Sequence, residues 1–285
     1  MMTSNDYNLL VTLLRIDNQH QVKRLVTQVM RNFYGEDKVE EKLEYTYVEG
    51  DIPVMLVAHC DTVCVAPVTE ICATAWDNDK QAGLTNKEQA PLGADDRAGI
   101  FIILKIIADG YRPYILFTTD EEIGGVGAMA AADNIFSPDI KFILELDRQG
   151  ANDAAMYECG NEKFIEMLKS YGFEPVSGTF SDICFFAPEW DIAATNLSVG
   201  YYHEHTPWET LYVRELETTL KRVEQMLDDA EKYDYFDYQA KYPTYKGQYW
   251  DALTAVGWSD LDFSETKGSK KNGKKKKKHI NKYAM

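Results

Sequence analysis

Four short apolar segments, each followed by acidic residues or a histidine, organise the sequence. The polar residues that follow them are His59 and Asp61 after residues 53–58, Glu121 and Glu122 after residues 114–118, Asp147 after residues 141–146, and His203 and His205 after residues 194–199. Near-continuous apolar strands that alternate with helices are typical of a mostly parallel sheet covered on both faces. We therefore predict an α/β fold with three αβα layers around a mixed, mostly parallel central sheet.

Helical periodicity fills the intervals between these strands. Residues 3–34 predict two helices that are separated at Asp17-Asn18 and end at Gly35, and further helices are predicted at 100–108, 125–132, 162–170 and 216–230. The alternation in residues 43–48 predicts a strand near a sheet edge. Residues 64–92, which are rich in Asn, Asp, Gly and Lys, predict a loop.

Candidate chemistry lies where the predicted strands end. Parallel strands place their carboxyl ends at one edge of a sheet, where sites form, so we expect the polar residues above to meet although they span 146 positions. Asp95 and Asp96 add two carboxylates in a glycine-flanked turn before the apolar helix 100–108. Each of these residues alone is more typical of a turn, a cap or a solvated surface. Together they would bury more negative charge than a protein holds without cations, and mixed His and carboxylate ligands suit Zn²⁺, with Mn²⁺ or Co²⁺ as substitutes.

Five motifs, in this order, resemble the signature of the co-catalytic di-zinc peptidase superfamily, which includes carboxypeptidase G, the bacterial tripeptidases and the leucyl and glutamyl aminopeptidases. They are His59-x-Asp61-Thr62-Val63, Gly93-Ala94-Asp95-Asp96-Arg97-Ala98-Gly99, Glu121-Glu122, Asp147 and His205-Thr206-Pro207-x-Glu209. The resemblance covers residues 53–210 and implies a zinc-exopeptidase-like fold.

The resemblance also implies a ligand set for two Zn²⁺ ions. His59 and Asp147 would bind one ion, Glu122 and His205 would bind the other, and Asp95 would bridge both. His205 is preferred to His203 because only His205 is followed by the Thr-Pro-x-Glu of the motif. The family pattern further implies a cis peptide between the two aspartates of the glycine-flanked turn.

Two more carboxylates receive catalytic roles from the same resemblance. Asp61 would orient the imidazole of His59, and Glu121 would be the general base that takes a proton from the water shared by the metals and passes it to the leaving amine. We expect substrate contacts from residues close to these motifs in the sequence. They are His203, Arg148, Asp182 and Tyr202, although Ser181-Asp182 also fits a turn or a cap and His203 also fits an exposed loop.

The sequence divides into three parts. Residues 1–232 predict a single catalytic domain, without the lid of many relatives because only 57 residues separate Asp147 from His205. Residues 233–266 form an aromatic and acidic extension that either wraps onto the body or binds a partner. Residues 267–285 form a lysine-rich tail that we expect to be disordered.

Charge and cysteine content narrow the partners and the compartment. The tail carries nine lysines and no acid, so the remaining 266 residues carry a formal charge of −25, which is the total of −16 less nine positive charges. So acidic a body repels nucleic acid, and we expect at most weak nucleic-acid contact through the tail. Five cysteines without a CxxC pair, no signal peptide and no apolar stretch long enough to span a membrane predict a cytoplasmic protein.

These observations predict a zinc-dependent hydrolase of peptide bonds, most simply an aminopeptidase or another exopeptidase of small peptides. The same site would serve an N-acyl amino acid amidohydrolase or deacetylase, and a non-catalytic metal-binding scaffold is the alternative from a different class. Glu121 argues against the scaffold because a structural metal site has no need of a base. Cys60 is a poor nucleophile for His59 because adjacent strand residues face opposite sides of a sheet. The oligomeric state stays open.

Overall fold

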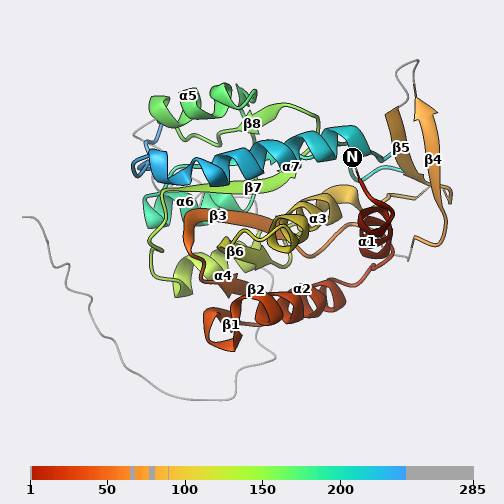
Figure 1. Cartoon of the computed structure of the whole chain (residues 1–285), viewed down its shortest axis with the longest axis horizontal. Helices are drawn as coiled ribbons and strands as arrows, with labels where there is room; N and C mark the ends of the chain where they lie inside the picture. Colours follow the sequence, from red (N-terminus) through yellow and green to blue (C-terminus); the bar gives the residue numbers. More distant parts are fainter. Residues whose placement is uncertain (1, 65–67, 77–80, 89, 242–285) are drawn as a thin grey trace, which may run out of the picture. The chain divides into compact units, whose positions relative to one another are not determined.

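A mixed sheet of eight strands forms the centre of the part of the chain that the structure describes (Figure 1). The computed structural model describes residues 2–64, 68–76, 81–88 and 90–241. In spatial order the strands are β1 (Val39–Glu41), β2 (Tyr45–Val48), β6 (Pro113–Thr118), β3 (Ile52–His59), β7 (Phe142–Arg148), β10 (Ala194–Ser198), β8 (Asp153–Ala155) and β9 (Glu174–Val176). Strands β6, β3, β7 and β10 run parallel to one another. The predicted α/β class with a mostly parallel, mixed sheet is confirmed.

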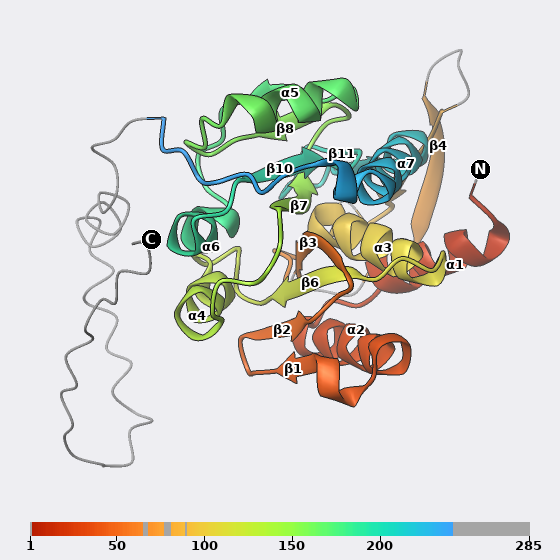
Figure 2. The same ribbon diagram turned by 60° about the vertical axis from the view of Figure 1, so that its left-hand side comes forward.

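Helices cover both faces of this sheet (Figures 1 and 2). One face packs against α1 (Ser4–Leu14), α2 (Gln19–Tyr34), α3 (Ala94–Ala108), α5 (Glu162–Ser170) and α7 (Val213–Asp228). The opposite face packs against α4 (Val126–Asn134) and α6 (Ile183–Trp190). Two short 3₁₀ turns, η1 (Glu36–Lys38) and η2 (Ala230–Lys232), complete the helical elements of the described residues.

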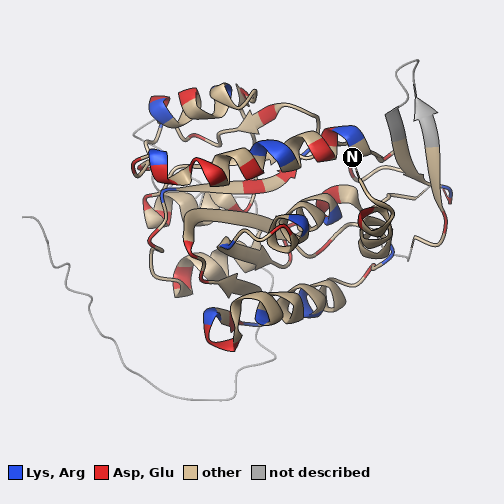
Figure 3. Ribbon diagram, in the orientation of Figure 1, with Lys and Arg blue, Asp and Glu red and all other residues tan. Residues whose placement is uncertain are grey.

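The alternation of side chains along the central strands sorts them between the two cores. On β3, Leu56 and Ala58 belong to the core under α3, whereas Met55 and Val57 belong to the core under α4 and α6. Because successive strand residues face opposite sides, His59 points to the α4 and α6 side, and Cys60 packs into the other core. Charged residues are frequent on the outer helices, such as α5 and α7, and are few on the central strands (Figure 3).

Local capping signals explain the first two helices. The hydroxyl of Thr3 accepts a hydrogen bond from the backbone N–H of Asp6, and the Asp6 carboxylate accepts one from the Thr3 N–H, which forms a capping box for α1. Asn18 caps α2, and Gly35, at a φ of 96°, ends it. The break predicted at Asp17-Asn18 is therefore the start of a new helix.

The prediction of a loop for residues 64–92 is wrong. Strands β4 (Ile71–Trp76) and β5 (Gln81–Asn86) pair as an antiparallel hairpin, and β5 also pairs with β12 (Thr210–Tyr212). With β11 (Tyr201–Tyr202) they form a second, antiparallel sheet in the order β11-β12-β5-β4. The ladder of β5 is completed by a strand more than 120 positions away, a contact that local composition does not predict.

Residues 233–241 lie along the body. The backbone N–H of Phe236 donates to the carbonyl of Lys141, and the N–H of Ala193 donates to the carbonyl of Phe236. The Phe236 ring packs against Phe142 and Phe164, with centroids 6.0 and 5.4 Å away. The rest of the predicted extension and the lysine-rich tail lie outside the described residues. Within the described part of the chain, no helix has the length and apolar character needed to cross a membrane.

Candidate metal centre

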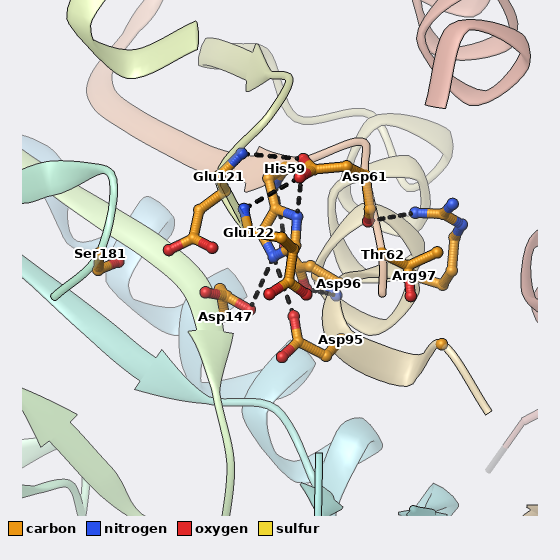
Figure 4. A network of polar contacts seen from close by, with 12 residues as sticks. His59, Asp61, Thr62, Asp95, Asp96, Arg97, Glu121, Glu122, Asp147 and Ser181 are labelled. Atoms are coloured by element: carbon orange, nitrogen blue, oxygen red, sulfur yellow. Dashed lines mark hydrogen bonds and ion pairs between the residues drawn. The ribbon is translucent and has the colours of Figure 1, made fainter. Parts of the chain in front are cut away.

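Residues from five separate segments meet at the carboxyl ends of β3, β6 and β7 (Figure 4). The segments are the end of β3 with His59 and Asp61, the start of α3 with Asp95, the turn after β6 with Glu121 and Glu122, the end of β7 with Asp147, and the loop after β11 with His205. The structure thus brings together all the residues that the sequence proposed as metal ligands or as catalytic carboxylates.

His59 forms the buried half of the cluster. Its side chain is 1% exposed, and its Nε2 lies 2.9 Å from Asp95 Oδ1 and 3.3 Å from Asp147 Oδ1. Ligand atoms about 2 Å from one tetrahedral zinc ion stand about 3.3 Å apart. The three side chains therefore present their donor atoms at the spacing of ligands that share an ion.

His205 forms the second half with Glu122. Its Nε2 lies 2.9 Å from Glu122 Oε2 and 3.2 Å from Asp95 Oδ2. Asp95 therefore turns one carboxylate oxygen toward His59 and the other toward His205. A carboxylate shared in this way between two donor sets is the arrangement of a bridging ligand.

The backbone of the turn before α3 holds Asp95 in this position. Gly93 adopts a φ of 72°, in the left-handed region that glycine tolerates, and the Asp95–Asp96 peptide is cis, as the resemblance implies. The buried Glu209 carboxylate accepts hydrogen bonds from the backbone N–H groups of Gly93 (3.0 Å) and Asp95 (3.1 Å). Glu209, the last residue of the His205 motif, thus secures the backbone around Asp95.

Asp96 lies near the same cluster, since its carboxylate is within 4.8 Å of the ligand atoms of His59 and Asp147. Both of its oxygens accept backbone hydrogen bonds, Oδ2 from the N–H of His59 at 3.2 Å and Oδ1 from the N–H of Gly99 at 2.9 Å. These bonds tie α3 to the end of β3 and favour Asp95 over Asp96 as the ligand.

Asp61 connects His59 to the turn that carries the two glutamates. Its Oδ1 lies 3.3 Å from His59 Nδ1, and its carboxylate accepts hydrogen bonds from the backbone N–H groups of Glu121 (3.2 Å) and Glu122 (3.0 Å). These interactions lower the pKa of Asp61 against the opposing effect of burial. Asp61 therefore stays ionised and sets the position of the turn relative to the imidazole.

Burial and mutual repulsion distort the protonation of the cluster. Burial raises the pKa of Glu121 and that of Asp147 to about 8. Hydrogen bonds to Asp95 and Glu122 raise the pKa of His205 to about 11. Five carboxylates thus face two imidazoles, and among the described residues no lysine or arginine forms an ion pair with them. At neutral pH the metal-free cluster relieves this excess by keeping protons on Glu121 and Asp147, and bound cations would relieve it in their place.

The predicted substrate contacts lie around the cluster and not within it. His203 is exposed at a φ of 58°, and Arg148 Nε lies 4.0 Å from Asp153 Oδ2. Asp182 is fully buried and accepts a hydrogen bond from Thr118, and the Tyr202 hydroxyl donates to Glu215 on α7 at 2.8 Å. Their roles toward a substrate remain predictions.

Several residues that support the cluster carry no role in the sequence-based predictions. Tyr201 and Asn196 contact Asp147, and Glu209 contacts the turn at Gly93. Arg97 donates to the backbone carbonyls of Ile16, Cys60 and Asp61. Gln19 contacts Asp120. Asn196 and Glu145 are polar residues within otherwise apolar strand segments, and this break in the apolar pattern could have marked them as residues that support the site. The Glu145 carboxylate accepts a hydrogen bond from Ser181.

Comparisons with known proteins agree on the fold. The sequence matches no family model and no curated protein. The structure is similar to aminopeptidase PepT of Bacillus cereus, with a TM-score of 0.58 and 16% identity over 79% of this chain and 98% of that one. It is also similar to a tripeptidase of Staphylococcus aureus, with a TM-score of 0.61 and 13% identity over 82% of this chain and 100% of that one. A TET aminopeptidase from a Thaumarchaeota archaeon gives a TM-score of 0.60 and 12% identity over 80% of this chain and 99% of that one. At these identities the comparisons establish the fold that this chain shares with peptidases.

Proposed function

We propose that this protein is a metal-dependent exopeptidase of small peptides, most simply an aminopeptidase, that works with two zinc ions. The observation that carries the proposal is the Asp95 carboxylate, whose two oxygens face two separate donor sets at 2.9 and 3.2 Å. A structural zinc site is a closed set of four ligands around one ion, and it needs no shared carboxylate. The fold, which this chain shares with aminopeptidases and a tripeptidase, supports the same reading.

Five residues would hold the metal pair: His59 and Asp147 on the buried side, Glu122 and His205 on the exposed side, and Asp95 between them. When bound, the pair would supply electrophilic polarisation of the scissile carbonyl and would lower the pKa of a water molecule. In the metal-free cluster the excess of carboxylates is destabilising. With the metal ions bound, the same carboxylates would neutralise the charge of the ions.

Glu121 is the proposed proton carrier. It lies next to Glu122 in the turn after β6, and its backbone is held by Asp61. Its side chain points toward the space beside Asp147 (Figure 4). A carboxylate there can take the proton from the attacking water and deliver it to the leaving amine. Burial raises its pKa to about 8, and bound cations would lower that pKa toward the range of a working base.

The charge around the cluster favours the amino end of a peptide. An enzyme that trims the carboxyl end must accept a free carboxylate, for which arginine is the usual partner. Of the arginines next to the ligands in sequence, Arg97 donates to backbone carbonyls and Arg148 lies near Asp153. The acidic surroundings that remain suit the ammonium group of a substrate.

The test combines metal analysis with a substrate panel. The parent protein, Glu121→Gln and the control Glu166→Gln, which changes an exposed residue of α5, are loaded with zinc and assayed on dipeptides, tripeptides, aminoacyl amides and N-acyl amino acids. We expect about two zinc ions per chain in all three proteins. Turnover of peptides with a free amino group should fall about 10²- to 10⁴-fold in Glu121→Gln alone.

Other outcomes of this assay would redirect or remove the proposal. Turnover confined to N-acyl amino acids would assign the same site to an amidohydrolase. Fewer than one zinc ion per chain in the parent protein would exclude the di-zinc assignment, and equal turnover by Glu121→Gln would remove Glu121 from the mechanism.

A further inference from the structure

Two consecutive tyrosines of β11 lead into the loop that carries His205, and their side chains go to different places. Successive strand residues face opposite sides. Tyr201 is buried, with 2% of its surface exposed, and its hydroxyl reaches Asp147. Tyr202 is half-buried, and its hydroxyl donates to Glu215 on α7. The Tyr201 hydroxyl therefore contacts the cluster of proposed ligands, and the Tyr202 hydroxyl lies outside that cluster.

The Tyr201 hydroxyl lies 3.2 Å from Asp147 Oδ1 and 3.0 Å from the Asp147 carbonyl. Asp147 Oδ1 is also the oxygen that faces His59 Nε2 at 3.3 Å. A phenol that donates to a carboxylate limits the rotation of that carboxylate and favours its ionised form. Burial raises the pKa of Tyr201 well above its ordinary value, so the phenol remains protonated and remains a donor.

The backbone of Asp147 is fixed separately, by the side-chain amide of Asn196. Asn196 Oδ1 accepts from the Asp147 N–H at 2.8 Å, and Asn196 Nδ2 donates to the Asp147 carbonyl at 3.1 Å. With the main chain held in this way, the direction of the carboxylate depends on what contacts its oxygens. The phenol is a neutral, directional contact of that kind.

The main chain of Tyr201 is itself well anchored. Its carbonyl accepts from the N–H of Gly150 at 2.8 Å, and Tyr201 pairs with Leu211 on β12. One short strand, β11, therefore contacts the buried half of the cluster through Tyr201. The loop that follows β11 carries His205, which belongs to the exposed half.

We propose that Tyr201 is a positioning residue, which orients Asp147 for the buried metal ion through its hydroxyl group. The inference rests on the proposed function, because it assumes that Asp147 is a metal ligand. Loss of such a supporting contact typically costs 10- to 100-fold in metal affinity.

The test compares Tyr201→Phe with Tyr202→Phe. Each removes one hydroxyl group from the same strand, and only the first contacts a proposed ligand. Zinc affinity is measured at pH 7.5 by competition with a chromophoric chelator, and peptide turnover is measured in parallel. In Tyr201→Phe we expect one of the two zinc ions to bind about 10- to 100-fold more weakly. At saturating zinc, kcat should fall and KM should change little. Tyr202→Phe should bind both zinc ions with the parental affinity, and it is the control for zinc affinity alone because Tyr202 is a predicted substrate contact.

A second measurement keeps the inference testable if Tyr201→Phe is less stable. A double-mutant cycle with Asp147→Asn, read from urea unfolding of the metal-free proteins, should show a non-additive shift in the unfolding midpoint, because the two groups contact each other directly. Parental zinc affinity in Tyr201→Phe, or additive shifts in the cycle, would overturn the proposal. A parent protein that binds two zinc ions but cleaves no peptide would contradict the proposed function and leave this inference standing.

Discussion

The two halves of the candidate metal centre are built in opposite ways. His59 ends an eight-residue strand in the middle of the sheet, and its side chain is 1% exposed. His205 lies on a loop, at a φ of 62° in the left-handed region, and its side chain is 46% exposed. Side chains on packed strands are placed by the core, whereas loop residues depend more on local contacts and on ligands. The comparison indicates that the buried half is preorganised, whereas the exposed half is completed when its ligand binds.

Asp95 belongs to both halves, so its removal has the largest expected effect. In Asp95→Ala we expect the loss of both zinc ions at micromolar free metal. Peptide turnover should drop by about 10³-fold or more, because metal-ion catalysis contributes several kcal/mol. Metal analysis and steady-state assays check this. The control is Asp109→Ala, which alters an exposed aspartate at the other end of α3. Retention of two zinc ions in Asp95→Ala would contradict the bridging role.

Replacement of the two histidines separates the halves. In His205→Ala we expect one zinc ion to remain bound, since the buried donor set is intact, and the thermal midpoint of the metal-free protein to change by only a few degrees. In His59→Ala the buried ion should be lost and the metal-free protein should be destabilised by about 2 kcal/mol or more, because a buried side chain leaves a cavity among unpaired carboxylates. His20→Ala, at an exposed site on α2, is the control. An equal loss of metal-free stability in the two variants would refute the comparison.

Asp61 lies between the two halves, and its effect should be intermediate. The Asp61 carboxylate now accepts hydrogen bonds from two backbone N–H groups. Asp61→Asn keeps the size of the side chain, but its NH₂ group faces one of these donors and cannot accept the hydrogen bond. We expect zinc affinity or kcat to fall about 10- to 100-fold. Chelator competition and peptide assays measure this. Asp51→Asn, at the other end of β3 and paired with Lys38 on the surface, should behave as the parent protein.

The charge excess also predicts how the metal-free protein responds to pH. The raised pKa of Asp147 and Glu121, about 8, means that the folded protein keeps protons that the unfolded chain releases near pH 4. Their contribution to stability is complete below about pH 4 and is lost as the pH rises toward 8. The raised pKa of His205, about 11, acts in the same direction above about pH 6.5.

We therefore expect the thermal midpoint of the EDTA-treated protein to be about 5 °C lower at pH 8.5 than at pH 6.0. Zinc should restore the midpoint at the higher pH, since cations favour the ionised carboxylates. Differential scanning calorimetry with and without zinc measures both quantities. A metal-free midpoint that rises between these two pH values would show that the cluster does not carry the predicted charge.

The smallest expected effect concerns the brace behind the glutamate turn. Gln19 Nε2 donates to Asp120 Oδ1 at 2.7 Å, and the N–H of Asp120 donates to Gln19 Oε1 at 3.2 Å. Gln19→Ala should cost about 1 kcal/mol of stability, the net value of a hydrogen bond or two, and should lower kcat a few-fold by loosening Glu121. Urea unfolding and peptide assays test this, with Gln28→Ala on the exposed side of α2 as the control. Unchanged stability and kcat would show that the brace is dispensable.

Local patterns in the sequence predicted the elements that carry the site. The apolar segments became β3, β6, β7 and β10, and the polar residues after them lie at one sheet edge because the strands are parallel. The same approach failed for residues 64–92, where β4 and β5 depend on a ladder with β12. Hydrophobic alternation is a local signal, and pairing with a distant strand is not.

Neighbouring residues of the same type show where the sequence reaches its limit. By itself it determined the fold class and the strands that end near His59, Glu122 and Asp147, because periodicity is a property of the chain. The preference for His205 over His203 came from the resemblance of the His-Thr-Pro-x-Glu motif to the family pattern. Only the tertiary structure decided that Asp95 faces both histidines while Asp96 is bound to backbone N–H groups. It likewise decided that Tyr201, and not Tyr202, contacts Asp147. The physical reason is that the direction of a side chain depends on packing and hydrogen bonds between segments that are distant in the sequence.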